Sequence, residues 1–168
     1  YEGASLLEIG AEARVGRGTL YRHFSSKAGL FAAVLLDMAG AVASAARVPS
    51  LPKVPAGERA AVDGLSAFAA AALDHLGGER SLVLHRAAIA AAPRDPALAR
   101  MVHDIVRAPW VAPLAAWFEG VAGLDAPRWL AEAVLVLALR GNRLFLSERG
   151  LDPAEAAAHA RLMARIVV

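Results

Sequence analysis

The sequence predicts an all-α protein. Of its 168 residues, 57% are hydrophobic and only 6% are aromatic, with abundant Ala and Leu. Alanine and leucine have high helix propensity, and the β-branched runs typical of strands are almost absent. Capping residues, prolines and glycines divide the apolar segments into stretches of helical length. The chain is long enough for a small domain joined to a medium one.

The first two expected helices are short and adjacent. Ser5 and Glu8 have the spacing of a capping box, in which each side chain satisfies a free amide at a helix start. This predicts a helix over residues 6–13, which residues 14–16 interrupt. A second short helix is expected over residues 17–24. Two short helices joined by a tight turn form a helix-turn-helix.

A third helix, expected over residues 27–46, precedes the domain boundary. Two serines stand before it, and either can cap its start. Three prolines within residues 47–57 exclude a helix there. We therefore predict a helix-turn-helix domain with its connecting helix over residues 1–46, and a larger helical domain over residues 47–168.

The larger domain is expected to hold further helices separated by proline or glycine. Pro109 and Pro113 lie inside one of them, and we expect them to kink or split it. Another has a long stretch without charge, so most of its circumference should be buried. The expected ranges are 58–76, 79–92, 97–121, 128–148 and 153 to near the end of the chain.

The composition excludes several classes of protein. Without Cys there is no disulfide and no thiolate metal site. The histidines show no metal-binding spacing, and no acid, base or nucleophile arrangement is recognisable. We therefore predict no metal, no cofactor and no enzymatic activity. No uncharged run reaches the roughly 18 residues of a membrane helix, so a cytoplasmic protein with no membrane partner is expected.

The distribution of charge says more than its total. The formal net charge is only +2. Between Ala13 and Leu36, however, there are four basic residues and no acidic one. This local excess on a helix-turn-helix favours a nucleic-acid partner.

The run from Ile9 to Phe24, with Gly18-Thr19-Leu20-Tyr21 and the following Ser26-Lys27, resembles the DNA-binding domain of the TetR family of bacterial transcriptional regulators. Residues 90–99 are similar to one common type of TetR-family ligand domain. The resemblance implies a three-helix DNA-binding head, a larger domain that dimerises and holds a small apolar effector, and ligand-triggered release from an operator. The first helix of the head would then lie before Tyr1.

Three residues depart from the family pattern. Arg14 stands where Gly is usual, and a non-Gly residue in a left-handed turn costs about 1 to 2 kcal/mol. Gly16 replaces a usual Ser and loses a side-chain cap, at about a few tenths of a kcal/mol. Gly10 replaces Ala. Together they predict a looser head with the same fold.

The expected partner is double-stranded operator DNA. Because a recognition helix enters the major groove by its N-terminal part, Arg17 is our first candidate for reading bases, with phosphate contact alone as the alternative. Thr19, Tyr21 and Lys27 match family positions that commonly bind phosphate. Gly18 would permit close approach. Additional DNA-contact candidates, each with a merely solvated or capping role as the alternative, are His23, Ser5, Arg22 and Arg14.

A homodimer is expected, because one head covers too little DNA for tight binding. The expected interface comprises the helices at about 128–148 and 153–166, although the first of these could instead form the core of the monomer. An effector pocket would be apolar and aromatic, with an ordinary core role as the alternative for each residue. The pocket candidates are Phe68, Leu84, His85, Ile89, Met101, Ile105, Trp110, Trp117 and Phe118.

The function predicted from the sequence is that of a TetR-like DNA-binding transcriptional regulator, a repressor released from its operator by a small apolar effector. The alternative is a helical small-molecule-binding or enzymatic protein whose head does not bind DNA. The departures at Arg14 and Gly16 are the observations that give this alternative some support.

Overall fold

The computed structural model describes residues 3–52, 58–122, 127–139 and 152–167. The prediction of an all-α protein is confirmed, because these residues form eight helices and no strand. The helices are α1 (Leu6–Glu12), α2 (Arg17–His23), α3 (Lys27–Ser44), α4 (Glu58–Leu76), α5 (Glu79–Ala91), α6 (Pro96–Ala122), α7 (Pro127–Ala138) and α9 (Pro153–Val167).

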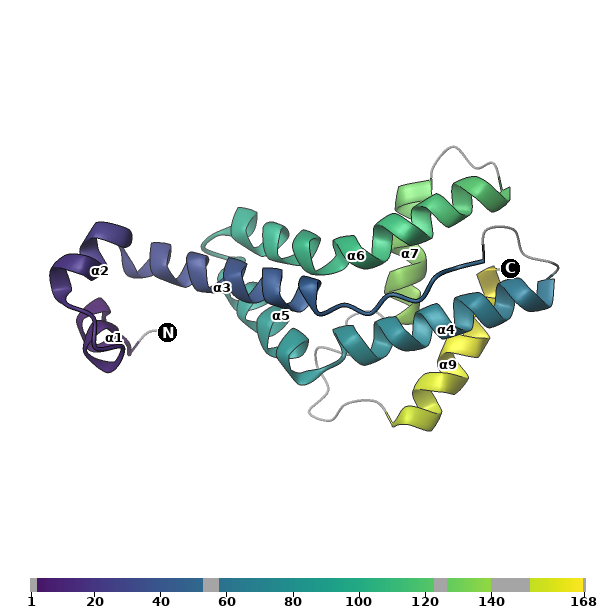
Figure 1. Ribbon diagram of the computed structural model, residues 1–168, viewed down its shortest axis with the longest axis horizontal. Coiled ribbons are helices and arrows are strands. Elements are labelled where there is room, and N and C mark those ends of the chain that lie inside the picture. The colour runs from purple at the N-terminus through teal and green to yellow at the C-terminus, as the bar shows by residue number, and fades with distance from the viewer. Residues whose placement is uncertain (1–2, 53–57, 123–126, 140–151, 168) are drawn as a thin grey trace.

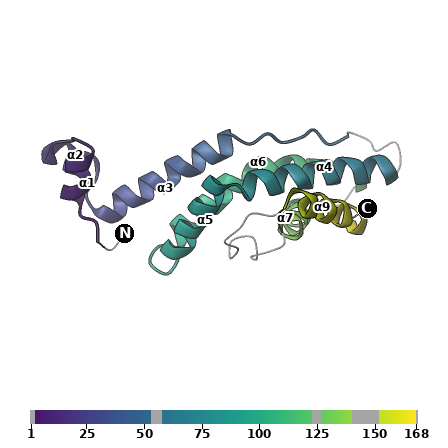
Figure 2. The same cartoon turned by 90° about the horizontal axis from the view of Figure 1, so that it is seen from below.

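The helices form a small head and a larger body. Helices α1 and α2 lie together at one end of the molecule, and α3 joins them to the body (Figure 1). In the body, α6 packs against α3, α5 and α7, while α4 packs mainly against α9. A second view shows the head standing clear of α4, α7 and α9 (Figure 2). Helix α3 therefore belongs to both parts, since from Leu35 onward it buries Leu35, Ala39 and Val42 in the core of the body.

The segment after α3 is fixed to the body. It runs alongside α4 and α6 (Figure 1), and the indole N–H of Trp117 donates a hydrogen bond of 2.8 Å to the carbonyl oxygen of Pro52. A Cβ atom placed on Gly64 of α4 would lie 2.8 Å from Cδ of Pro52. This close approach of the proline ring explains a glycine in the middle of α4.

Helix α6 is continuous, so the prolines do not split it. Pro109 and Pro113 both lie inside the helix, and Figure 1 shows it bending along its length. Each proline removes a backbone donor and costs about 3 kcal/mol in a helix interior. Trp110 and Leu114, which follow the two prolines, are both fully buried. The burial of these large side chains offsets the cost of the prolines and keeps the chain helical.

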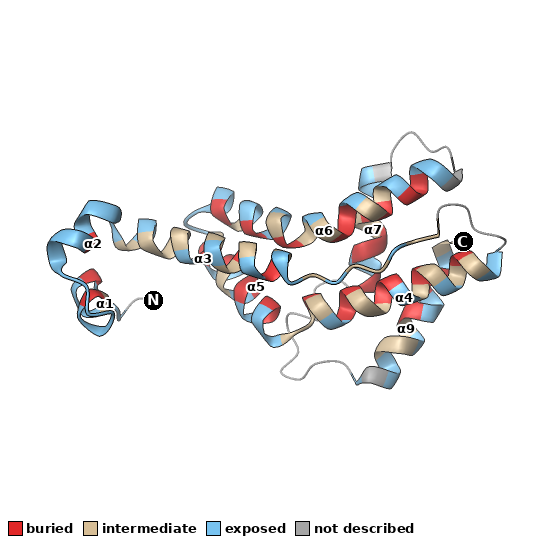
Figure 3. Ribbon diagram, in the orientation of Figure 1, coloured by how far each residue is buried: buried red, intermediate tan, exposed pale blue. Residues whose placement is uncertain are grey.

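The core of the body is centred on α4 and α6. Trp110 packs edge-on against Phe68 of α4, with 5.6 Å between the ring centroids. Leu84 of α5 and Leu135 of α7 complete this centre with almost no exposed surface. Figure 3 shows the buried residues gathered in the body, while the head is mostly exposed.

Helix α3 is long and apolar enough to cross a membrane by length and composition alone. Its place in the fold gives another reason for that composition, because one face of the helix packs against α5 and α6. Of the helix expected over residues 128–148, the described part ends with α7 and Leu139, and residues 140–148 lie outside the described residues.

Candidate nucleic-acid interface and effector cavity

The turn between α1 and α2 contains a left-handed residue at Arg14, where the resemblance to the TetR family implied a position suited to glycine. Arg14 has a φ of 54°. Among the described residues, it is the non-glycine residue with a positive φ. The amide of the next residue, Val15, donates to the carbonyl oxygen of Gly10 at 2.8 Å. A side chain at this φ is strained by about 1 to 2 kcal/mol, so Arg14 keeps the turn at a cost in stability.

Gly10 lets the two helices of the head approach closely. A Cβ atom at this position would lie 3.2 Å from Cδ2 of Leu20 and 3.3 Å from the carbonyl oxygen of Val15. Leu20 is the buried residue of α2, and Leu6 is its buried counterpart on α1. Gly10, which departs from the family pattern, therefore allows α1 and α2 to pack closely. Its effect is not only to loosen the head.

The remaining surface of α2 is exposed and carries the expected DNA contacts. Arg17, Gly18, Thr19, Arg22 and His23 are all exposed, and so is 43% of Tyr21. The Arg17 guanidinium lies 5.5 Å from the centroid of the Tyr21 ring, within cation–π range. This contact restricts the Arg17 side chain, which remains exposed.

Two of the expected phosphate-binding residues already have partners within the head. Ser5 forms the predicted capping box with Glu8, accepting from its amide at 3.2 Å and donating its own amide to the carboxylate at 2.8 Å. The Ser5 hydrogen bonds, with a smaller effect of Lys27, lower the pKa of Glu8. Lys27 Nζ donates to the carbonyl oxygen of Ala4 at 2.8 Å, which ties the start of α3 to the start of α1.

The body contains a mainly apolar cavity of about 260 Å³ between α4, α5, α6 and α7. Its polar end is formed by His85 of α5 with His103 and Arg107 of α6. The apolar lining consists of Leu76, Ala88, Ile89, Ala92, Ala99, Val136 and Leu139. Such a chamber, with a few convergent polar groups, is the usual form of a small-molecule site.

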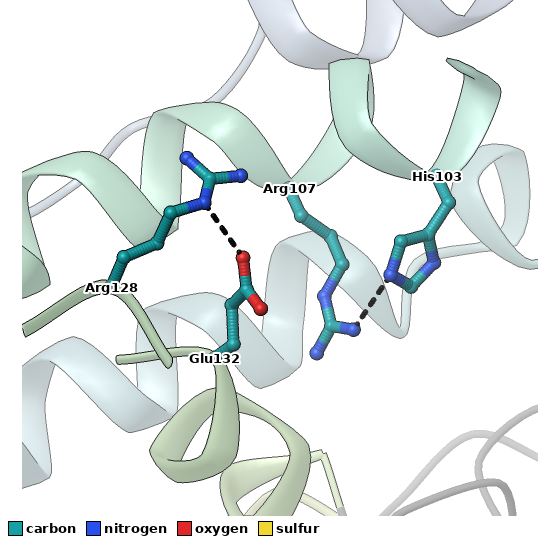
Figure 4. A network of polar contacts seen from close by, with 4 residues as sticks. All are labelled: His103, Arg107, Arg128 and Glu132. Atoms are coloured by element: carbon teal, nitrogen blue, oxygen red, sulfur yellow. Dashed lines mark hydrogen bonds and ion pairs between the residues drawn. The ribbon is translucent and has the colours of Figure 1, made fainter. Parts of the chain in front are cut away.

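Each polar side chain of the cavity forms a hydrogen bond within the protein. Arg107 Nη1 lies 2.9 Å from His103 Nε2 (Figure 4). A guanidinium can only donate, so this ring nitrogen accepts. His85 Nδ1 lies 2.8 Å from the Ser81 carbonyl oxygen, so it donates. The His103 ring is therefore neutral in this arrangement, because a protonated imidazole has no accepting nitrogen.

Burial opposes charge throughout this cluster. Desolvation is the first cause that lowers the pKa of His85 and of Arg107. His103 is exposed as a residue, but desolvation on its cavity side likewise comes first in lowering its pKa, followed by the charge of Arg107. The cluster thus keeps one positive charge, on Arg107, beside two neutral rings.

The structure separates the expected pocket residues into three groups. His85 and Ile89 line the cavity. Met101 is largely exposed and Ile105 is partly buried. The other five are buried in the core of the body: Phe68, Leu84, Trp110, Trp117 and Phe118. Among the described residues, no group of three or more His, Asp or Glu side chains is placed to hold a metal ion.

A wider groove of about 550 Å³ lies between α3, α4 and α5. Its walls include the carboxylates of Asp37, Asp74 and Glu79 and the guanidinium of Arg80. Three carboxylates facing one basic group make this groove mainly acidic, unlike the cavity at Arg107.

Comparisons with known proteins agree with this architecture. Residues 1–34 match the model of bacterial regulatory proteins of the tetR family. Residues 63–124 match that of the C-terminal domain of AefR-like transcriptional repressors. The chain belongs to the TetR family. It is accordingly a transcription regulator with a helix-turn-helix DNA-binding domain.

A solved structure supports the same fold. A crystal structure of a protein assigned to the TetR-family transcriptional regulators of Mesorhizobium loti MAFF303099 superposes with a TM-score of 0.70. It shares 23% sequence identity and covers 99% of this chain and 86% of that chain. A search of the curated proteins finds no match.

Two features of this TetR-family protein were not found from the sequence. Neither His103 nor Arg107 was a pocket candidate, although their spacing of four residues places them on one face of a helix. That spacing was the available signal. The bond from Lys27 to Ala4 joins residues distant in the sequence, so no local pattern marked it.

Proposed function

We propose that this TetR-family regulator is a cytoplasmic, homodimeric repressor that a small effector releases from its operator. The observation that carries the proposal is the exposed face of α2, which presents Arg17, Thr19, Tyr21 and Arg22 without an acidic side chain. On this proposal, residues 1–46 bind DNA and connect to the body, while residues 47–168 bind the effector and dimerise.

The roles of the DNA-facing residues follow from their position on α2. Arg17 lies in the first turn, which is the part of a recognition helix that meets base edges. A Cβ atom placed on Gly18 would have no neighbour within 4 Å, which leaves room for the groove wall. Thr19 and Tyr21 would donate to phosphates, and Arg14 and Arg22 would add electrostatic attraction. His23 would contact a phosphate or a base.

The dimer interface is proposed on α7 and α9. Each helix buries one face in the body, yet α7 leaves 63% of Trp129 and 51% of Leu137 exposed. Helix α9 leaves 58% of Leu162 and 69% of Ile166 exposed. The two helices contact each other, and His159 Nε2 lies 2.9 Å from the Leu137 carbonyl oxygen. Large exposed apolar side chains on two helices in contact support a two-fold interface.

Effector binding would act through α3. Helices α5 and α6 line the cavity, and both pack against α3, which carries the head. A ligand that favours one spacing of α5 and α6 would therefore favour one angle of α3. In a dimer, that angle sets the distance between two heads that must reach half-sites about 34 Å apart.

A salt-titrated binding assay on the DNA upstream of the protein's own gene tests the function. We expect Arg17→Ala to relax sequence preference, with a loss of about 1 to 3 kcal/mol at one base position. We expect Lys27→Ala to weaken binding to all sequences equally and to lower the salt slope by about one. Arg100→Ala on α6, which removes the same charge outside the head and the proposed dimer interface, is the control.

The outcomes separate the proposed roles. An unchanged salt slope for Lys27→Ala would assign Lys27 to the Ala4 contact alone. Equal losses on all sequences for Arg17→Ala would remove its base-reading role. If the wild-type protein shows no preference for the upstream DNA over scrambled DNA, the alternative of a small-molecule-binding or enzymatic protein with an inactive head replaces the proposal.

Sedimentation analysis tests the dimer separately. We expect a double variant, Leu162→Glu with Ile166→Glu, to sediment as a monomer, because it places charge on the proposed interface. Val83→Glu, at a position on α5 that is 49% exposed, should leave the dimer intact. A dimeric double variant would place the interface elsewhere.

A further inference from the structure

We propose that the cavity between α4, α5, α6 and α7 accepts a small molecule with an apolar body and a carboxylate group, and that Arg107 pairs with the carboxylate. This inference rests on the proposed effector function and adds the chemical class of the effector. It replaces a purely apolar effector with a small, mainly apolar acid.

The walls of the cavity select an apolar body of limited size. Leu76, Ala88, Ile89 and Leu139 supply aliphatic surface from three different helices or their ends. The volume of about 260 Å³ lies just below the range of about 300 to 1,000 Å³ that holds drug-sized ligands. A molecule with one short chain or one ring fits such a space.

The positive charge of Arg107 is only partly compensated by its surroundings. It is half-buried, its Nη1 bonds to His103, and its Nε is buried without a hydrogen-bond partner among the described residues. No described carboxylate forms an ion pair with it. A partly desolvated charge of this kind is unfavourable unless an opposite charge approaches. A ligand carboxylate is the group that guanidinium geometry fits best.

None of the neighbouring described groups pairs with the Arg107 guanidinium as a ligand carboxylate would. Glu132, the closest acidic candidate on α7, pairs with Arg128 at 3.0 Å (Figure 4). Glu132 and Asp104 favour the charged form of Arg107 only through longer-range attraction, which burial outweighs. His103 and His85 are neutral and accept or donate within the protein. A neutral apolar ligand would bury the guanidinium further without compensating it.

Isothermal titration of the full chain, without DNA, tests the proposal. The probes are octanoate and phenylpropionate, each compared with its neutral amide of the same shape. We expect at least one acid to bind ten-fold or more tightly than its amide. Arg107→Met should remove that preference and leave the affinity for the amide unchanged. Arg100→Met, at an exposed position on the same helix, should retain the preference.

Further variants keep the test decisive. If Arg107→Met does not fold, Arg107→Lys, which keeps the charge but not the planar fork, should retain part of the acid preference. Glu132→Gln should tighten acid binding severalfold, because it removes a negative charge near the site. The proposal is overturned if neither acid binds the wild-type protein, if acid and amide bind equally, or if Arg107→Met keeps the preference.

DNA binding separates this inference from the proposed function. A protein that binds upstream DNA but neither acid keeps the proposed function and loses this inference. If the protein binds an acid at Arg107 but does not bind DNA, this inference about the site stands and the proposed function fails. A bound acid that leaves operator binding unchanged would keep the site but contradict its role as an effector site.

Discussion

The head and the body of this protein are stabilised in different ways. Within α1 and α2, the buried residues are Leu6, Gly10 and Leu20, and none belongs to the main core. The body buries a continuous cluster that extends from α3 to α9. The head relies more on local features, such as the capping box at Ser5 and the bond from Lys27 to Ala4.

This difference follows from what each part must present. A helix that meets DNA keeps its polar side chains exposed, so little apolar surface remains for packing. The body has no such restriction and buries large side chains from five helices or more. We therefore expect substitutions in the body to affect global stability, and those in the head to affect local order and DNA binding.

Trp110→Ala should produce the largest effect. Trp110 is fully buried against Phe68 and His75, and removal of a buried Trp costs about 3 to 5 kcal/mol. We expect the midpoint of urea unfolding, followed by circular dichroism, to fall sharply. Trp110→Phe is the matched control: its indole N–H has no described partner, so this change should cost much less. Similar losses for the two variants would contradict the packing at Trp110.

Leu20→Ala should have a smaller and more local effect. It removes the main buried side chain of α2, at about 2 to 5 kcal/mol for a core leucine and nearer the low end in so small a cluster. We expect operator binding to be lost while the main thermal transition, which reports the body, hardly shifts. Parallel melting and DNA-binding measurements check this. A large shift of the main transition would show that head and body unfold as one unit.

Arg14→Gly should give the smallest effect, and a stabilising one. The change relieves the strain at a φ of 54°, worth about 1 to 2 kcal/mol before the entropy of the added glycine is subtracted. Amide hydrogen exchange should slow in α1 and α2 but not in the body. Gly16→Ser, which restores a side-chain cap at a position open to a Cβ, should add only about a few tenths of a kcal/mol. Faster exchange in Arg14→Gly would contradict strain at this turn.

The sequence alone predicted the local features of the head. The capping box at Ser5 and Glu8 depends on residues close together in the chain, whereas the left-handed turn at Arg14 was expected from the family resemblance. In the body, the helix over residues 58–76 was likewise predicted with the bounds it has in the structure. Spacing and side-chain type suffice for such features, because the groups that interact are a few residues apart.

Only the tertiary structure decided which residues surround the cavity. Trp110 and Phe68 were pocket candidates because they are large and aromatic, but they pack against each other and are buried in the core. No local pattern marked Arg107, which the packing of α5, α6 and α7 places at the cavity beside His85. Burial depends on which helix faces meet, and those contacts join residues far apart in the sequence. The physical reason is that the sequence pattern identifies the apolar face of a helix. Which helix packs against that face depends on the packing of the whole domain.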